Sequence, residues 1–306
     1  MGSVEAIRVG VVGLGSMGLG MATSLVKRGI AVSGYDLNPA AAAQLVQAGG
    51  RSADSAAEAA RGADALVVVV VNADQTEAVL FGDGAAAREM QPDGVIAACA
   101  TMAPQDARRL ADKASASGLL YLDAPISGGA VKAAAGQLTI MASGSPEAFE
   151  KAHPVLEAMA GTVHRLGDAA GIGASFKMVN QLLAGVHIAA ACEAITFAAR
   201  LGLDLPTVYE VITGSAGNSW MFENRVPHIL EGDYSPRSAI DIFIKDLGIV
   251  SDMGRHEKFP LQLSATALQL FLATAAAGMG RDDDASVARM IARLTGVALP
   301  ESAKRE

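Results

Sequence analysis

The sequence is poor in cysteine and in positive charge, and each of these two shortages excludes a class of protein. Among 306 residues there are two cysteines, Cys99 and Cys192, which excludes a disulfide framework and favours a reducing compartment. The net charge is −8 at pH 7 and no basic run occurs, so we expect no nucleic-acid partner. We also predict no metal site.

We do not expect any segment to span a membrane. The longest apolar segment, 171–201, contains Lys177, Asn180, Gln181, His187 and Glu193, so we expect no membrane partner. The first apolar run is short and leads into a glycine loop, so we expect no signal peptide and a cytoplasmic protein. The length of 306 residues suggests about two domains.

The main feature of the sequence is this apolar segment, residues 171–201, whose pattern predicts one helix near 45 Å long. It is apolar around most of its circumference, so we expect it to be buried in protein. Lys177, Asn180 and Gln181 share one face at positions i, i+3 and i+4. A lysine in a buried helix is costly unless a charged or reactive group meets it, so we place the chemistry here. The alternative is a lysine that reaches past the helix to solvent.

A glycine loop follows the first predicted strand, residues 7–12. Its members are Gly13, Leu14, Gly15, Ser16, Met17 and Gly18. They spell G-x-G-x-x-G between a buried strand and a helix, which is the context of a dinucleotide-binding loop. The glycines allow the tight turn and a close approach of pyrophosphate, and the helix N-terminus supplies N–H groups to the phosphates. We predict that these residues border a dinucleotide.

Asp36 ends the second predicted strand, 30–35, where a ribose-binding carboxylate belongs. An aspartate accepts hydrogen bonds from the ribose 2′-hydroxyl and repels a 2′-phosphate, and no arginine follows directly. The sequence therefore predicts NAD rather than NADP. The alternative is that Asp36 is a turn residue before a helix starting near Pro39.

Strands and helices alternate over the first half. Further strands are predicted at 64–71, 94–99, 119–124, 137–143 and 162–166, and helices at 54–61, 73–81, 104–117 and 146–160. This alternation predicts an α/β, doubly wound parallel sheet of the Rossmann type. Ligands of such sheets bind at the carboxyl ends of strands, so Val71, Asn72 and Thr101 are expected to border the cofactor. Ordinary turn chemistry is the alternative for each.

The second half lacks strand patterns. Helices are predicted at 206–213, 225–230, 241–255, 260–276 and 285–294. We therefore predict an NAD-binding Rossmann domain over 1–166 and an all-α substrate and oligomerisation domain over 167–306, starting with the long helix. Lys245 lies in an apolar helix, where the alternative to a functional role is an ion pair with Asp241. The apolar, alanine-rich composition suggests a homodimer or homotetramer.

Ser127, Gly128 and Gly129 follow another predicted strand. Two glycines after a serine can present consecutive N–H groups to an anion, and the serine hydroxyl adds a donor. A small carboxylate would fit such a loop. The alternative is an ordinary Ser-Gly-Gly turn.

Four segments resemble the β-hydroxyacid dehydrogenase family, which includes 3-hydroxyisobutyrate dehydrogenase and tartronate semialdehyde reductase. They are GLGSMGLGMATSL (13–25), DAPISGGAVKAAAGQLTIMASG (123–144), GIGASFKMVNQ (171–181) and KDLGIV (245–250). The resemblance covers essentially the whole chain and implies an NAD(P)-binding Rossmann domain, one long inter-domain helix and a helical domain. It implies that Lys177 is the catalytic lysine, that Ser127, Gly128 and Gly129 bind a substrate carboxylate, and that Lys245 lies beside the nicotinamide. Members often have Asn-Asn where this chain has Asn180-Gln181.

A finer resemblance is to members that oxidise the C2 hydroxyl of L-threonate to 2-dehydro-L-erythronate with NAD. It rests on segments 67–82, 127–136, 181–194, 216–225 and 233–250. Lys132 stands where many relatives have glycine and fits a more hydroxylated substrate, so Lys132, Asn180 and Gln181 are expected to bind the small hydroxy-carboxylate. Lys177 would take the hydroxyl proton, which requires burial or a neighbouring cation, for which Lys245 is the candidate.

Three other functions compete with this interpretation. One is reduction of a short semialdehyde or of glyoxylate by NADPH, against which Asp36 argues. A second is a decarboxylating enzyme of the 6-phosphogluconate type, for which the chain is too short. The third is a catalytically silent NAD sensor, which would be expected to have lost Lys177.

Overall fold

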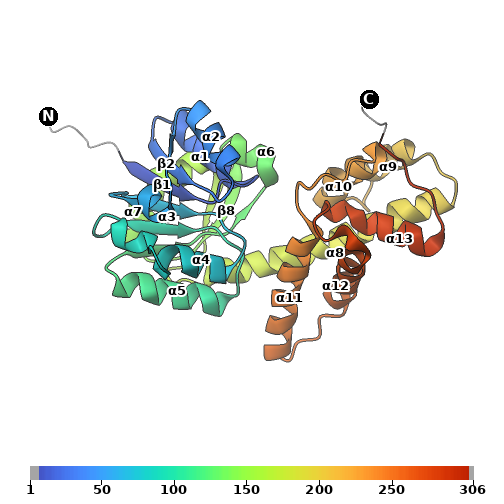
Figure 1. Cartoon of the computed structure of the whole chain (residues 1–306). Coiled ribbons are helices and arrows are strands. Elements are labelled where there is room, and N and C mark those ends of the chain that lie inside the picture. The colour runs from blue at the N-terminus through green and yellow to red at the C-terminus, as the bar shows by residue number, and fades with distance from the viewer. Residues whose placement is uncertain (1–6, 303–306) are drawn as a thin grey trace. The chain divides into compact units, whose positions relative to one another are not determined.

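The computed structural model describes residues 7–302, in two compact units, Met1–Lys177 and Met178–Glu306. The first is α/β and the second is helical (Figure 1). The division falls inside helix α8, Ile172–Arg200, so the first turns of that helix belong to the α/β unit. The predicted boundary after residue 166 assigns all of α8 to the second domain. This assignment, with its substrate and oligomerisation role for residues 167–306, remains a prediction.

A six-stranded parallel sheet forms the centre of the first unit, in the order β3-β2-β1-β4-β5-β6. The strands are β1 (Arg8–Val12), β2 (Ala31–Tyr35), β3 (Arg51–Ser52), β4 (Ala65–Val68), β5 (Val95–Ala98) and β6 (Leu120–Asp123). The α-helices that accompany them are α1 (Gly18–Lys27), α2 (Pro39–Gln47), α3 (Ala56–Ala60), α4 (Ala73–Phe81) and α5 (Pro104–Ala116), with a 3-10 turn η1 (Ala86–Glu89). This strand order reverses direction at β1, where such sheets bind their ligands.

Helices cover both faces of this sheet, which is why its central strands are continuous apolar runs. Successive residues of β1 alternate between two cores: Val9 and Val11 face one, and Val12 faces the other. The first core is closed by α1, α2 and α7 (Pro146–Met159), and the second by α3, α4 and α5. The predicted α/β, doubly wound parallel sheet is confirmed.

A second sheet of three strands follows β6 and departs from the expectation of a single sheet. It has the order β7-β8-β9, from β7 (Ile126–Ser127), β8 (Leu138–Ala142) and β9 (Ala160–Arg165), and β7 is antiparallel to β8. Between β7 and β8 lies a short helix, α6 (Gly129–Ala134), which the sequence analysis missed. The chain turns back after Ser127, so the strand predicted at 137–143 pairs with β7 and β9 and not with β6. An isolated bridge between Asp123 and Ser143 joins the two sheets.

The second unit is helical throughout, as predicted. Beside most of α8 it contains α9 (Leu205–Thr213), α10 (Trp220–Glu231), α11 (Ile240–His256), α12 (Gln262–Thr274), a π turn η2 (Ala275–Met279), a 3-10 turn η3 (Asp284–Ser286) and α13 (Val287–Thr295). Ile188, Cys192 and Ile195 of α8 lie at the centre of its core, together with Phe243 and Phe271, whose rings stack.

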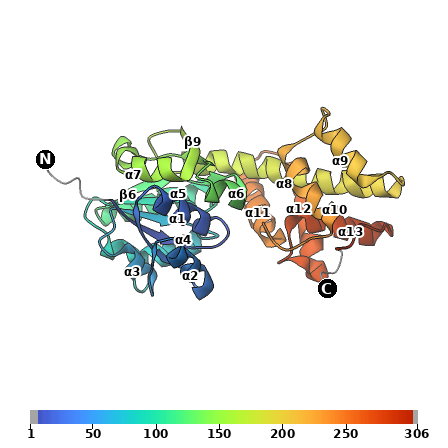
Figure 2. The ribbon, with the colours of Figure 1, turned by 90° about the horizontal axis from the view of Figure 1, so that it is seen from above.

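Helix α8 is the long helix coloured yellow-green to yellow in Figures 1 and 2. It was expected to be buried in protein, and most of it is buried or half-buried, but one stripe remains exposed, including Phe176, Val179, Leu183 and Phe197. Among residues 7–302 it alone passes the length and hydropathy criteria for a membrane span, yet 50% of its most apolar window is buried inside the fold. A core helix of a globular protein meets the same criteria.

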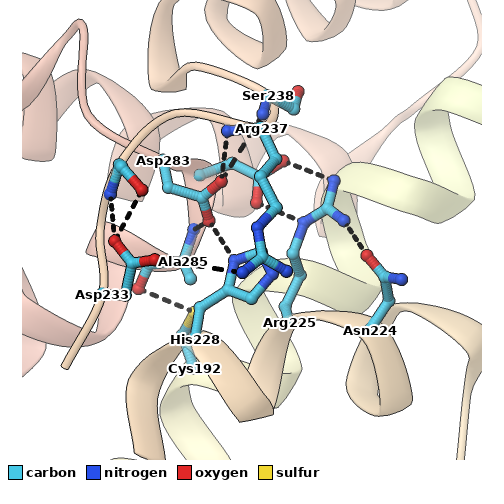
Figure 3. A network of polar contacts seen from close by, with 11 residues as sticks. Cys192, Asn224, Arg225, His228, Asp233, Arg237, Ser238, Asp283 and Ala285 are labelled. Atoms are coloured by element: carbon cyan, nitrogen blue, oxygen red, sulfur yellow. Dashed lines mark hydrogen bonds and ion pairs between the residues drawn. The ribbon is translucent and has the colours of Figure 1, made fainter. Parts of the chain in front are cut away.

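A cluster of charged residues is buried beside this apolar core (Figure 3). The Arg225 guanidinium forms a two-pronged ion pair with Asp284, with Nη2 to Oδ2 at 2.9 Å. His228 Nδ1 lies 2.8 Å from Asp283 Oδ1, and the other oxygen of Asp283 accepts a bond from the Arg237 N–H. Burial alone would raise the pKa of Asp283, but the bonds from His228 and the backbone lower it below its ordinary value. The cluster fastens α10 to the segment before α13.

We expect Asp284→Ala to lower the free energy of unfolding by about 3–5 kcal/mol, because it leaves the Arg225 charge buried without its partner. Urea unfolding followed by circular dichroism measures this. The control is Asp252→Ala, which breaks an ion pair with Arg255 whose side chains are 80% and 72% exposed and should cost less than about 1 kcal/mol. Equal losses in the two variants would contradict the expectation.

Candidate active site

The glycine loop is built so that backbone, not side chains, lines its open side. A Cβ on Gly13, whose φ is +92°, would collide with the Val69 carbonyl, and one on Gly18 would collide with the Gly13 carbonyl. A Cβ on Gly15 would meet nothing within 4 Å. The N-cap residue of α1, Met17, makes no side-chain hydrogen bond to the helix, so no side chain occupies the N-terminus of α1, where an anion can bind. These features fit a dinucleotide pyrophosphate.

Asp36 lies directly beside this loop. Its Oδ2 accepts a hydrogen bond from the Leu14 N–H at 2.6 Å, and its Oδ1 accepts one from the Asn38 N–H at 2.7 Å. Each carboxylate oxygen has a second lone pair, so the group can still accept bonds from ribose hydroxyls. Asp36 is therefore part of the loop's architecture as well as a candidate ribose ligand.

The residues predicted at other strand ends have more local roles. Asn72 caps α4, accepting a hydrogen bond from the Gln75 N–H at 2.8 Å, and the Val71 N–H donates to the Gln75 side chain. This is the turn chemistry that the sequence left open as an alternative. The Val71 side chain is exposed and Thr101 is half-buried, so both can still border a bound ligand.

Ser127 ends β7, and Gly128 and Gly129 open helix α6. Both glycines have positive φ, +136° and +77°, which explains why this loop requires glycine. A Cβ on Gly128 would lie 3.0 Å from the Lys132 side chain, so the stem of Lys132 folds back over the loop. The structure thus brings Lys132 to the predicted carboxylate loop.

Lys177 is buried, with 7% of its surface exposed, and the snorkelling alternative is therefore wrong. Its Nζ donates a hydrogen bond of 2.8 Å to the Ile126 carbonyl. Because Ile126 immediately precedes Ser127, the ammonium group lies at the start of the Ser127-Gly128-Gly129 loop. This hydrogen bond joins the two predicted elements, Lys177 and the Ser127-Gly128-Gly129 loop.

The start of α8 is held by two residues that the sequence analysis did not single out. Asp123, at the end of β6, is 1% exposed, and its Oδ2 accepts hydrogen bonds from the N–H groups of Gly171 at 2.9 Å and Ala174 at 2.8 Å. Ser143 Oγ accepts the Gly173 N–H at 2.9 Å. Burial raises the pKa of Asp123 to about 6, against the opposing effect of these bonds. Its position before the Ser-Gly-Gly loop was the only sequence signal.

Asn180 and Gln181 belong to a chain of polar contacts in the helical unit. Asn180 Nδ2 donates to Gln181 Oε1 at 2.9 Å, and Gln181 Nε2 donates to Asp246. The other oxygen of Asp246 pairs with Lys245 Nζ at 2.6 Å, so Lys245 has a carboxylate partner in its direct neighbour. Asp246 was missed by the sequence analysis, although it is the direct neighbour of Lys245. Gln181 is buried and Asn180 is half-buried, which makes Asn180 the more accessible amide.

The glycine loop, the aspartate beside it and the strand order define the first unit as a dinucleotide-binding domain of a dehydrogenase. A family model described as the NAD binding domain of 6-phosphogluconate dehydrogenase matches residues 8–167. A second, described as NAD-binding of NADP-dependent 3-hydroxyisobutyrate dehydrogenase, matches residues 171–291. Within residues 7–302, no three His, Cys, Asp or Glu side chains gather as metal ligands do.

Known relatives extend the likeness over the full chain. An L-threonate dehydrogenase of Cupriavidus necator is 52% identical over 97% of this chain and 99% of its own. A 3-hydroxyisobutyrate dehydrogenase of Pseudomonas aeruginosa is 33% identical over 86% of this chain and 90% of its own. A crystal structure from Salmonella typhimurium, described as a 3-hydroxyisobutyrate dehydrogenase, has a TM-score of 0.90 and 50% identity, covering 93% and 99% of the two chains. The chain belongs to the β-hydroxyacid dehydrogenase family and is an NAD-binding oxidoreductase.

Proposed function

We propose that this enzyme oxidises the C2 hydroxyl of L-threonate to 2-dehydro-L-erythronate with NAD. The observation that carries the proposal is the buried Lys177 ammonium, bonded to the carbonyl directly before the Ser127-Gly128-Gly129 loop. A group that can exchange a proton and a loop that can bind a carboxylate are thereby placed side by side, as oxidation of a hydroxy acid requires. The full-length identity of 52% to an L-threonate dehydrogenase supports the choice of substrate.

In the proposed mechanism, the Ser127 hydroxyl and the N–H groups of Gly128 and Gly129 hold the substrate carboxylate. Lys177, in its neutral form, accepts the proton of the C2 hydroxyl, and the C2–O bond becomes a carbonyl as the C2 hydrogen leaves with its electron pair. NAD⁺, when bound, would supply the acceptor for that hydride at C4 of its nicotinamide. In reduction, the Lys177 ammonium returns the proton to the oxygen.

The remaining predicted residues have positioning roles in this proposal. Lys132, folded over Gly128, is placed to meet a hydroxyl of the sugar acid. Asn180 and Gln181, one turn after Lys177 on α8, are assigned to substrate binding, and Asp246 fixes the orientation of Gln181. Gly13 to Gly18 and Asp36 bind the pyrophosphate and the ribose, with Val71, Asn72, Thr101 and Lys245 also bordering the cofactor.

The test is a substrate screen with the purified enzyme, following NADH or NADPH absorbance. L-Threonate with NAD should give the highest kcat/KM among L-threonate, 3-hydroxyisobutyrate, L-serine and D-glycerate. A higher kcat/KM for 3-hydroxyisobutyrate would support the alternative that the description of the Salmonella structure suggests. No turnover of any hydroxy acid would contradict the proposal, provided that NAD binding is intact.

Cofactor choice should follow Asp36. We expect kcat/KM to be higher with NAD than with NADP, because the carboxylate repels a 2′-phosphate, and we expect Asp36→Ala to narrow the gap. The change also removes the bond to the Leu14 N–H, so some loss with both cofactors is expected. Glu58→Ala, which removes a half-buried carboxylate that pairs with Arg51 and accepts the Asp54 N–H, is the control and should leave the ratio unchanged. Equal kcat/KM for both cofactors in the unmodified enzyme would contradict the expectation.

We further propose a cytoplasmic homodimer or homotetramer. The helical unit exposes apolar side chains of the kind that subunit interfaces cover, including Phe197, Leu201 and Trp220. Both cysteines are free and buried, which is compatible with a reducing compartment. Light scattering on the purified protein tests the oligomer, and a monomer at assay concentration would overturn that part of the proposal.

A further inference from the structure

The start of α8 depends on one buried carboxylate. The first N–H groups of a helix have no partner within the helix, and α8 begins inside the fold, where water is scarce. Asp123 Oδ2 satisfies two of these groups, on Gly171 and Ala174, and the positive end of the helix dipole favours a negative charge there. Because Asp123 ends strand β6, the sheet itself determines where the helix begins.

The surrounding backbone leaves little freedom for another arrangement. A Cβ on Gly173 would meet the Met141 and Asp123 carbonyls, so the helix start lies directly against β6 and β8. Ser143 Oγ accepts the intervening Gly173 N–H, and the backbones of Asp123 and Ser143 bond to each other in both directions at 2.9 and 3.0 Å. The helix start is therefore held by two strands from two different sheets.

The hydrogen bonds of Asp123 to the start of α8 and the bond of Lys177 to Ile126 connect the same two segments of the chain. Ala174, bonded to Asp123, is one helical turn before Lys177, and Lys177 Nζ bonds to Ile126, which lies shortly after Asp123 in the chain. A shift of the helix start would move the ammonium group relative to the Ser127-Gly128-Gly129 loop. We propose that Asp123 is a positioning residue, whose carboxylate sets the place at which Lys177 meets the substrate loop. This inference rests on the proposed role of Lys177.

The ionised form of Asp123 holds the start of α8, because a carboxylate oxygen accepts N–H hydrogen bonds more strongly than a neutral carboxyl oxygen does. Burial raises the pKa of Asp123 to about 6. The Cys99 thiol and the Tyr121 phenol are the titratable groups that interact with the charge of Asp123. Burial and this charge raise the pKa of both groups, so both remain neutral below pH 8. Ser143 is the remaining side chain within bonding distance, at 3.4 Å. Protonation of Asp123 should therefore occur between about pH 7 and pH 5.

The direction of the effect on stability is opposite to that on activity. Because the pKa is raised in the folded state, ionisation of Asp123 costs folding free energy above about pH 6, and protonation removes that cost as pH falls. A loss of rate caused by protonation of Asp123 is then not a loss of the fold. Such a loss of rate would come from a shift of the start of α8, which moves Lys177 relative to the Ser127-Gly128-Gly129 loop.

The test compares Asp123→Asn with the unmodified enzyme in the reductive direction. There Lys177 acts as the acid, so its protonation favours the reaction, and a fall in rate toward low pH does not come from it. The unmodified enzyme should lose about 10-fold in kcat from pH 7 to pH 5, as the carboxylate is titrated. Asp123→Asn, which resembles the protonated form, should have a kcat about 10-fold lower at pH 7.5 and should be nearly independent of pH. The Kd for NADH should change little.

Two control variants separate positioning from general destabilisation. Val155→Ala removes core volume from α7 without touching α8 and should keep the acid-side fall in kcat. Ser143→Ala retains the carboxylate, so it should keep the fall even if kcat is reduced. Hydrogen exchange at pH 7, measured by mass spectrometry on a peptide covering 170–178, should be faster in Asp123→Asn and unchanged in Val155→Ala.

The outcomes distinguish this inference from the proposed function. A normal kcat or a retained acid-side fall in Asp123→Asn would overturn the positioning role, and so would unchanged hydrogen exchange at the start of α8. If the unmodified enzyme reduces no 2-oxo acid, the proposed function fails, whereas the exchange experiment still tests whether Asp123 holds the helix.

Discussion

Lys177→Ala is expected to lower kcat by about 10²–10⁴-fold, the usual contribution of a positioned acid–base group. The reason is that the variant leaves no proton acceptor at the start of the Ser127-Gly128-Gly129 loop. NAD affinity should be retained, because Lys177 Nζ bonds to the Ile126 carbonyl, at the start of the Ser127-Gly128-Gly129 loop. Steady-state kinetics and an NAD titration by calorimetry measure the two quantities separately.

Lys177→Arg separates proton transfer from charge. A guanidinium keeps the positive charge but does not release its proton near neutral pH, so this variant should be nearly as inactive as the alanine variant. In oxidation, the rate of the unmodified enzyme should rise with pH as Lys177 loses its proton, and this rise should disappear in both variants. If Lys177→Arg kept most of the activity, Lys177 would act as an electrostatic clamp and the base would lie elsewhere.

The second large effect is expected at the glycine loop. Gly15→Val should abolish NAD binding at concentrations that saturate the unmodified enzyme, because the new side chain occupies the space where the pyrophosphate approaches the backbone. The fold should survive, since a Cβ at Gly15 meets nothing within 4 Å and its φ is not positive. Calorimetric titration of NAD, together with thermal unfolding in its absence, tests both statements.

Gly217→Val is the matched control, because Gly217 also has open space at its Cβ and no positive φ, but lies between α9 and α10. It should bind NAD normally. Gly18→Ala shows the contrasting case, in which the added Cβ collides with the Gly13 carbonyl and the variant should lose stability. Normal NAD binding by Gly15→Val would mean that the loop does not hold the pyrophosphate.

The elements with strong periodicity could be predicted from the sequence. The long helix was expected over 171–201 and occupies Ile172–Arg200, and the short helix over 73–81 is found at Ala73–Phe81. These segments have clear boundaries, such as Asn72 as an N-cap and the apolar pattern itself. The functional roles of the residues remain proposals, although the structure brings Lys177 to the Ser127 loop as the motif suggested.

What could not be predicted depends on contacts between residues distant in sequence. The segment 137–143 reads as a strand but does not show which strand it joins, and it pairs with β7 because the chain reverses after Ser127. Asp123 bonds to residues 48 and 51 positions later, so no local pattern reveals it as the anchor of α8. Asp246 likewise looks like half of a surface pair until Gln181 is placed beside it.

The separation of the two sheets has a consequence for changing the specificity of the enzyme. The glycine loop and Asp36 depend on the six-stranded sheet, whereas Ser127 and the loop over which Lys132 folds depend on β7, β8 and β9. Segment 126–142 is therefore a unit that can be exchanged with that of a relative acting on another hydroxy acid, provided that α6 keeps its contacts with α1, where Ser24 Oγ donates to the Ala133 carbonyl. Such a chimera should keep Asp123 and Ser143 from this chain, because their bridge is where the two sheets are joined.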